Sequence, residues 1–111
     1  MREEANSIDS LDDLKNKIKS RLSNIVFIPY FYSKIYQRPY LSEELVKKSL
    51  EEFDKYAGFQ KQEIKGSVRY RIGITLSKKY TLVVVIEVEK EHLNIVTTWK
   101  TNRKWQKAMQ K

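Results

Sequence analysis

Residues 67–76, SVRYRIGITL, alternate polar and apolar side chains along their length. A period of two is typical of a strand with one buried face, and it places Arg69 and Arg71 together on the polar face. The segment TLVVVIEVE at 81–89 is apolar on both faces for most of its length, which is typical of a central strand. HLNIVTTWK at 92–100 alternates again. The three segments predict an antiparallel meander.

The alternation within 92–100 predicts which of its side chains accompany the two arginines. Leu93 shares one face with Ile95, Thr97 and Trp99, and the other face holds Asn94, Val96, Thr98 and Lys100. In this register, Thr98 and Lys100 lie on the same face as Arg69 and Arg71. A further strand from Gln60 to Ile64, joined through a Lys65-Gly66 turn, would extend the sheet to four strands.

Two helices are predicted before the meander. Residues 10–22 carry apolar side chains at helical spacing, with Ser10 as N-cap, and their basic residues are expected to form a solvated face: Lys15, Lys17, Lys19 and Arg21. The second helix begins at Ser42, with Glu43 and Glu44 in its first turn, and runs to a stop near Ala57-Gly58.

The remaining segments are less regular. Residues 25–28 predict a short strand that Pro29 ends or restricts to a sheet edge, and the tyrosine-rich stretch 30–41 has no clear period. The tail 102–111 predicts a basic helix capped by Thr101 or Asn102. The predicted fold class is therefore α+β: N-terminal helices packed on a three- to four-stranded antiparallel meander, followed by a C-terminal basic helix.

Composition narrows the chemistry. The 111 residues suit one domain, and the absence of cysteine excludes disulfides, thiolate catalysis and sulfur-bound metals. His92 is the only histidine, so any metal would need carboxylate ligands, and no metal or cofactor is expected. No apolar run is long enough to span a bilayer, so a cytoplasmic protein without membrane contact is expected.

The charge is unevenly distributed along the chain. Residues 1–56 contain 10 basic and 10 acidic residues, whereas residues 57–111 contain 12 basic and 4 acidic, so the net charge of +8 belongs to the second half. One-sided basic surface is typical of proteins that neutralise phosphates. The pattern therefore indicates a polyanionic partner, and nucleic acid is the first to propose.

Several of these segments together resemble a known family. The helix start Leu41-Ser42-Glu43-Glu44-Leu45-Val46, the strand Arg69-Tyr70-Arg71-Ile72-Gly73 and the last strand Leu93-Asn94-Ile95-Val96-Thr97-Thr98-Trp99-Lys100 resemble the RelE/ParE toxin superfamily, closest in pattern to its BrnT-like branch. The resemblance covers roughly residues 31–100. Residues 1–24 add a helix that the compact toxins usually lack, and Lys34 stands where BrnT-like relatives often have histidine.

The resemblance implies a metal-independent endoribonuclease, free or ribosome-dependent, that binds RNA and is held by an acidic antitoxin protein. In such an enzyme the ribose 2′-hydroxyl attacks the adjacent phosphorus, and cationic donors stabilise the charge on the phosphoryl oxygens. The candidate catalytic residues are Arg69, Arg71, Thr98, Lys100 and His92. The candidate RNA-binding residues are Lys34, Arg38, Arg103, Lys104 and Lys107.

Other interpretations remain open. Arg69 or Arg71 could instead pair with Glu87 across the sheet, and the tyrosines at 30, 32, 36 and 40 could stack on bases or serve as core or antitoxin contacts. Asp54, Glu63 and Lys65 are the minimal pattern of a magnesium-dependent nuclease. The chain could also be a non-catalytic nucleic-acid-binding or protein-interaction module, or a purely structural partner.

Overall fold

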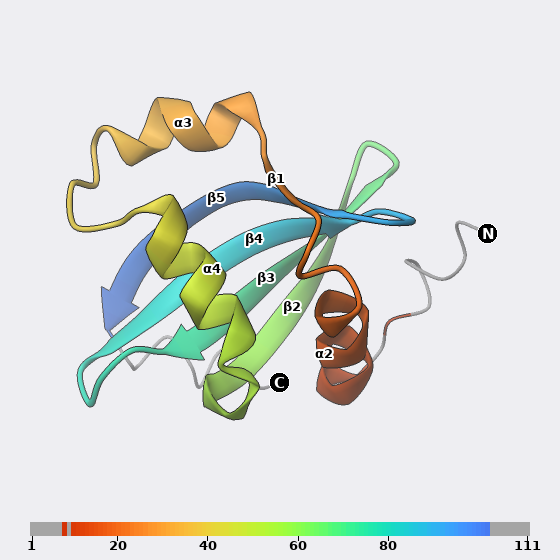
Figure 1. Ribbon diagram of the computed structural model, residues 1–111, viewed down its shortest axis with the longest axis horizontal. Helices are drawn as coiled ribbons and strands as arrows, with labels where there is room; N and C mark the ends of the chain where they lie inside the picture. The colour runs from red at the N-terminus through yellow and green to blue at the C-terminus, as the bar shows by residue number, and fades with distance from the viewer. Residues whose placement is uncertain (1–7, 9, 103–111) are drawn as a thin grey trace.

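The computed structural model describes residue 8 and residues 10–102, and these form an α+β fold (Figure 1). Within these described residues, three α-helices and five strands follow one another, with one 3-10 turn, η1, before the second strand. Their order is α2 (Leu11–Lys19), β1 (Ile25–Phe27), α3 (Pro29–Ile35), α4 (Glu43–Glu51), η1 (Phe53–Lys55), β2 (Tyr56–Ile64), β3 (Ser67–Thr75), β4 (Tyr80–Val88) and β5 (Leu93–Asn102).

The helices begin where capping chemistry predicts. The Ser10 side chain accepts a hydrogen bond from the Asp13 backbone N–H, and the Ser42 side chain accepts one from the Leu45 N–H, which confirms both N-caps. Pro29 stands in the first turn of α3, where its missing N–H costs no helical hydrogen bond. The tyrosine-rich stretch without a clear period therefore begins as a short helix. The second predicted helix ends earlier than expected, at Glu51, because β2 already starts at Tyr56.

The sheet is larger than the predicted meander. Its strand order is β1-β5-β4-β3-β2, so β4 is the central strand, as the sequence predicts. The antiparallel part has four strands, and β1 adds a fifth that runs parallel to β5, which makes the sheet mixed. The backbone N–H of Leu93 donates to Asn24 O at 3.0 Å and that of Ile28 donates to Ile95 O at 3.2 Å, and these bonds hold β1 at the edge.

Two features of the strand connections shape the sheet. Lys65 and Gly66 both have positive φ, 50° and 84°, which is the backbone of a tight type I′ hairpin turn between β2 and β3. A bulge interrupts the β4–β5 ladder, because Val85 pairs with Thr97 and Ile86 pairs with Ile95. Val96 is therefore the extra residue on β5, and the side-chain alternation reverses after it.

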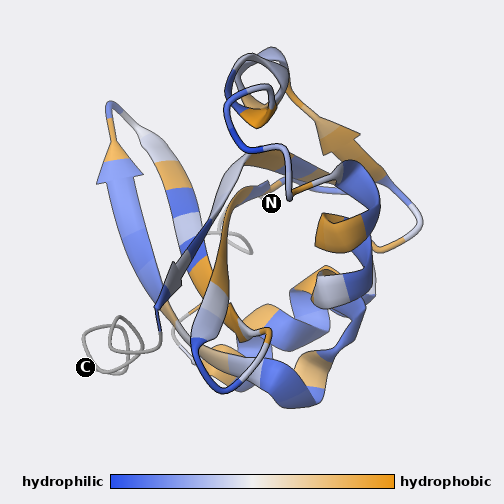
Figure 2. Ribbon diagram, turned by 90° about the vertical axis from the view of Figure 1, so that its left-hand side faces the viewer, coloured by the Kyte–Doolittle hydropathy of each residue, from blue (hydrophilic) through white to orange (hydrophobic). Residues whose placement is uncertain are grey.

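The core lies between the sheet and the helices. Leu14 and Ile18 of α2 and Val46 and Leu50 of α4 are fully buried, as are the facing strand residues Ile72, Ile74, Leu82, Val84, Ile86 and Ile95. Figure 2 shows the helices gathered on one side of the sheet with hydrophobic residues turned toward it. Burial of each such aliphatic side chain contributes about 1.5–3 kcal/mol.

The tail is only partly described. β5 continues to Asn102, so Thr101 and Asn102 are strand residues rather than helix caps. The predicted helix beyond them lies outside the described residues, as do Arg103, Lys104 and Lys107. No helix in the described part of the chain is long and apolar enough to cross a membrane.

Candidate nucleic-acid interface

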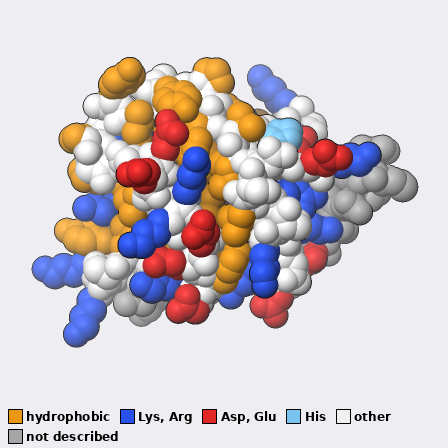
Figure 3. Space-filling view, viewed as in Figure 1, with side chains coloured by type: hydrophobic (Ala, Val, Ile, Leu, Met, Phe, Trp, Pro, Cys, Tyr) orange, Lys and Arg blue, Asp and Glu red, His pale blue; other side chains and the backbone are white. Residues whose placement is uncertain are grey.

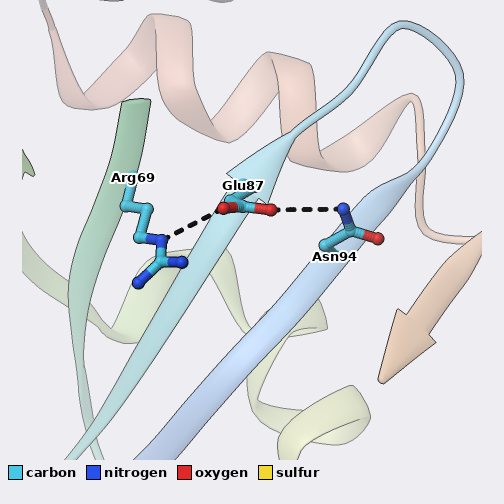
Figure 4. A network of polar contacts seen from close by, with 3 residues as sticks. All are labelled: Arg69, Glu87 and Asn94. Atoms are coloured by element: carbon cyan, nitrogen blue, oxygen red, sulfur yellow. Dashed lines mark hydrogen bonds and ion pairs between the residues drawn. The ribbon is translucent and has the colours of Figure 1, made fainter. Parts of the chain in front are cut away.

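Arg69 and Arg71 lie on the face of β3 that points away from the helices, as predicted. Two residues apart on one strand, their α-carbons are separated by about 7 Å. Their side chains have different environments. Arg69 Nε lies 3.0 Å from Glu87 Oε2, while Glu87 Oε1 accepts a hydrogen bond from Asn94 Nδ2 at 3.3 Å (Figure 4). The predicted alternative of an ion pair with Glu87 is thus confirmed for Arg69, and the carboxylate neutralises its charge.

Arg71 has no carboxylate partner among the described residues. Its Nε is buried and has no hydrogen-bond partner within the described part of the chain, and its guanidinium carbon lies 5.6 Å from the centre of the Trp99 ring. Arg71 pairs with Val85 on β4, and Trp99 pairs with Val83, so both side chains project from the same face of the sheet. Trp99, rather than Thr98 or Lys100, is the β5 residue that accompanies the arginine.

The predicted face for Thr98 and Lys100 is wrong. Because Val96 is bulged, Thr98 pairs with Val84 and Lys100 pairs with Leu82, and both belong to the face that the helices cover. Thr98 is only 1% exposed, and its hydroxyl donates to Val83 O at 2.8 Å. The hydroxyl that was expected to face a phosphodiester therefore lies in the core.

His92 is also apart from the other candidates. It is half-buried at the turn between β4 and β5, where its carbonyl accepts from the Glu89 N–H. Lys100 lies near the other end of β5, eight residues away, or about 26 Å along the strand. The five candidate catalytic residues thus divide among one sheet face, the opposite face and a turn, and they form no single constellation.

The magnesium-nuclease pattern is likewise not assembled. Asp54 lies in η1 before β2, and Glu63 lies near the far end of that nine-residue strand, which separates them by about 25 Å. Among the described residues, no group of three histidine, cysteine, aspartate or glutamate side chains could hold a metal ion.

A different cluster forms where β4 starts and β5 ends. Lys100 Nζ lies 4.4 Å from the centre of the Tyr40 ring and 4.6 Å from that of Tyr80. Arg38 Nη1 donates to Thr98 O at 3.0 Å and to Thr97 Oγ1 at 3.3 Å, which fixes the loop after α3 against the edge of β5. These contacts join three segments that are distant in the sequence, and they place cations and tyrosine rings side by side.

We call this cluster the basic–aromatic end. It comprises the exposed or half-exposed cations and tyrosines at the end of α3, in the α3–α4 connection, in the β3–β4 turn, at the start of β4 and at the end of β5: Lys34, Tyr36, Arg38, Tyr40, Lys78, Lys79, Tyr80 and Lys100. Tyr36 is 86% exposed. In Figure 3 blue and orange side chains meet at the left-hand end of the molecule, and the nearest red side chains lie just to the right of them.

The basic–aromatic end contains five cations and no acidic residue of its own. Residues 28–42, 75–86 and 92–102, which build it, contain no aspartate or glutamate. None of its five cations forms an ion pair with a described residue, in contrast to Arg69. Lys34 instead lies 5.5 Å from the ring centre of Tyr30 on the same helix. An arrangement of exposed rings with cations that form no ion pair is suited to phosphates and to flat aromatic ligands.

Sequence reasoning finds part of this surface. Lys34, Arg38 and Lys100 are among the candidates, but α3 ends at Ile35, so Lys34 and Arg38 do not share a helix. The sequence pattern places Lys78 and Lys79 only in a turn before the predicted strand at 81–89 and assigns no role to Tyr80. The signal that could have found them is a basic pair beside an aromatic residue within a stretch that contains no acid.

Tyr32 and Arg21 are excluded from the interface by their contacts. The Glu43 carboxylate near the Tyr32 hydroxyl raises the pKa of Tyr32, so this ring faces the start of α4. Arg21 was expected on a solvated basic face, yet it is only 7% exposed and bonds to backbone carbonyls.

No protein-family model matches the chain, and neither the curated proteins nor the solved structures contain a match. The family resemblance therefore remains a prediction.

Proposed function

We propose that this protein binds RNA through its basic–aromatic end and that binding, rather than cleavage, is its principal activity. The supporting observation is the convergence of three carboxylate-free segments, whose five cations have no described ion-pair partner, around exposed tyrosine rings. Unpaired cations on a surface attract phosphates and release counterions when they bind. The tyrosines add aromatic contacts that a purely electrostatic patch would lack.

The geometry favours binding over cleavage because the predicted catalytic groups are dispersed. In-line attack by a 2′-oxygen requires its acid, base and oxyanion donors around one phosphorus atom. Arg69 is neutralised by Glu87, Thr98 is buried, and Lys100 lies on the opposite face from Arg71. Binding requires only that cations and rings share a surface.

The salt dependence of binding tests this proposal. The logarithm of the affinity for single-stranded RNA should fall linearly with the logarithm of salt concentration, with a slope of about 0.7 per neutralised phosphate. Lys78→Ala combined with Lys79→Ala should weaken binding and reduce that slope by about 1.4. Both lysines are exposed in the β3–β4 turn and have no ion pair with a described residue.

The chain offers a matched control for charge. Lys17→Ala combined with Lys19→Ala also removes two positive charges, but from the end of α2. Hydrogen bonds from Arg21 hold this end of α2 at the β4–β5 turn, which lies at the other end of β4 from the basic–aromatic end. This pair should leave the slope within about 0.3 of the parent value. Equal effects of the two double variants, or binding without salt dependence, would show that the basic–aromatic end is not the RNA site.

A toxin-type endoribonuclease held by an acidic antitoxin is the second candidate. One observation favours it: Arg71 stays on the same sheet face as Arg69 and has no carboxylate partner among the described residues. Incubation of the protein with RNA in EDTA, with and without ribosomes, should then produce 2′,3′-cyclic phosphate ends that Arg71→Ala abolishes. Intact RNA with retained, salt-sensitive binding would favour the first proposal.

A further inference from the structure

The contact among Tyr40, Tyr80 and Lys100 carries a more specific inference, which rests on the proposed RNA binding. The Lys100 ammonium lies 4.4 and 4.6 Å from the two ring centres, well within the roughly 6 Å over which a cation is attracted to an aromatic face. One cation thus orients two rings that come from the α3–α4 connection and from the first residue of β4.

Both rings remain accessible in this arrangement. Tyr40 is 58% exposed and Tyr80 is 42% exposed, although each contacts the ammonium. Tyr80 is additionally fixed by its place in the sheet, since it pairs with Asn102 on β5. Its backbone N–H also donates to the Ser77 hydroxyl at 3.2 Å, within the β3–β4 turn. An exposed ring on a rigid strand loses little conformational freedom when it binds a flat ligand.

The chemistry around the rings indicates what that ligand is. A nucleotide combines a flat aromatic base with a phosphate, and this site combines two tyrosine rings with the Lys100 ammonium, while Arg38 and Lys79 lie within two residues of the rings along the chain. A compact organic cation does not fit, because Lys100 already supplies the ammonium that the rings attract. The absence of carboxylates from the surrounding segments likewise favours an anion.

We propose that Tyr40 and Tyr80, oriented by Lys100, form a stacking site for unpaired bases, so that the protein selects single-stranded RNA over duplex RNA. Bases in a duplex are already stacked on one another and cannot cover a tyrosine face. The lysines contact phosphates in either form, whereas the rings contribute only where bases are free. Because every base has an aromatic face, the selection concerns strandedness and is tolerant of sequence.

Substitution of the rings tests the site. The probe is a short fluorescein-labelled RNA of mixed sequence, measured by fluorescence anisotropy alone and after annealing to its complement at one salt concentration. Tyr40→Ala and Tyr80→Ala should each lower the affinity for the single strand by about tenfold, because each substitution removes one ring on which a base stacks. The affinity for the duplex should change by less than about threefold.

Two further sets of variants test why the alanine variants lose affinity. One set asks whether the ring or its hydroxyl matters, and the other asks whether the loss of any exposed tyrosine has the same effect. Tyr40→Phe and Tyr80→Phe keep the ring and remove the hydroxyl, so they should retain most of the single-strand affinity that the alanine variants lose. Tyr32→Ala is a matched loss of an exposed tyrosine that lies near Glu43 and does not belong to the basic–aromatic end, and it should bind single strands as the parent does. Thermal unfolding confirms that each variant is folded.

The outcomes distinguish this inference from the proposed function. If parent protein binds single strand and duplex equally, or if the alanine variants weaken both alike, the stacking site is refuted while salt-dependent RNA binding stands. If the phenylalanine variants lose as much as the alanine variants, a hydroxyl contact replaces stacking and the inference is overturned. If no RNA form binds, the proposed function fails and the stacking site fails with it.

Discussion

Arg21 provides a stringent test of how this fold is held together. Its guanidinium donates four hydrogen bonds: Nε to Glu89 O at 2.7 Å, Nη1 to Lys17 O at 2.9 Å and to Ser20 Oγ at 2.8 Å, and Nη2 to Lys90 O at 2.9 Å. The side chain is 7% exposed. It therefore joins the end of α2 to the β4–β5 turn, across 68 residues of sequence. We expect Arg21→Ala to destabilise the protein strongly.

The magnitude follows from the partners. Hydrogen bonds from a charged donor contribute about 1.5–3 kcal/mol each, but truncation is offset where the abandoned carbonyls recover water. The carbonyls of Glu89 and Lys90 belong to exposed turn residues and can be hydrated, so the net loss should be about 3 kcal/mol. Domains of this size have a free energy of unfolding of about 5–15 kcal/mol, so the loss is a substantial fraction of the total.

Two comparisons give the test its precision. Arg21→Lys keeps the charge, but a compact ammonium cannot reach carbonyls on both sides as the planar guanidinium does. This variant should therefore lose about half as much stability as Arg21→Ala. Lys19→Ala removes an exposed charge from the same end of α2 and should cost less than about 0.5 kcal/mol.

Urea unfolding followed by circular dichroism measures the free energies of unfolding. The denaturant dependence should be the same in all variants, so that the midpoints report stability. If Arg21→Ala loses no more stability than Lys19→Ala, Arg21 belongs to a solvated helix face, as the sequence suggests, and the reasoning from its contacts is refuted.

Two further predictions concern single contacts. Burial raises the pKa of Tyr56 above its ordinary value, and its hydroxyl donates to Leu50 O at 2.8 Å. Tyr56→Phe should therefore cost about 1 kcal/mol near neutral pH. Above about pH 10 the unfolded chain releases the Tyr56 proton before the folded protein does, so the parent loses stability. The difference in free energy of unfolding between the parent and Tyr56→Phe, measured by urea unfolding across this range, should therefore shrink. A constant difference would contradict the assignment. Glu87→Gln should cost about 0.5–1 kcal/mol, because the pair with Arg69 is partly exposed, with side chains 34% and 18% accessible. In a double-mutant cycle, Glu87→Gln and Arg69→Gln should be non-additive, and strict additivity would show that the pair contributes nothing.

The total positive charge of the chain overstates its capacity to bind anions. Arg21 is bound by carbonyls and Arg69 by Glu87, whereas the cations of the basic–aromatic end form no ion pair with a described residue. Lys34 and Arg38 come from the first half of the sequence, whose formal charge is balanced. A count along the chain assigns the anion-binding surface to the second half, yet the folded surface draws on both halves.

Local sequence was sufficient for the features that depend on neighbouring residues. The N-caps at Ser10 and Ser42, the Lys65-Gly66 turn and the central position of β4 all follow from short patterns. Each is decided by interactions within a few residues, or by how apolar one segment is on its two faces. The α+β class was predictable for the same reason.

Tertiary structure alone decided how these elements meet. The parallel pairing of β1 with β5 joins segments about seventy residues apart, and nothing in a three-residue strand specifies its neighbour. The bulge at Val96 reverses the faces of Thr98 and Lys100, because side chains alternate strictly and one extra residue turns the rest of a strand over. The same reversal brings Lys100 to Tyr40 and Tyr80, so the proposed site exists only in the folded chain.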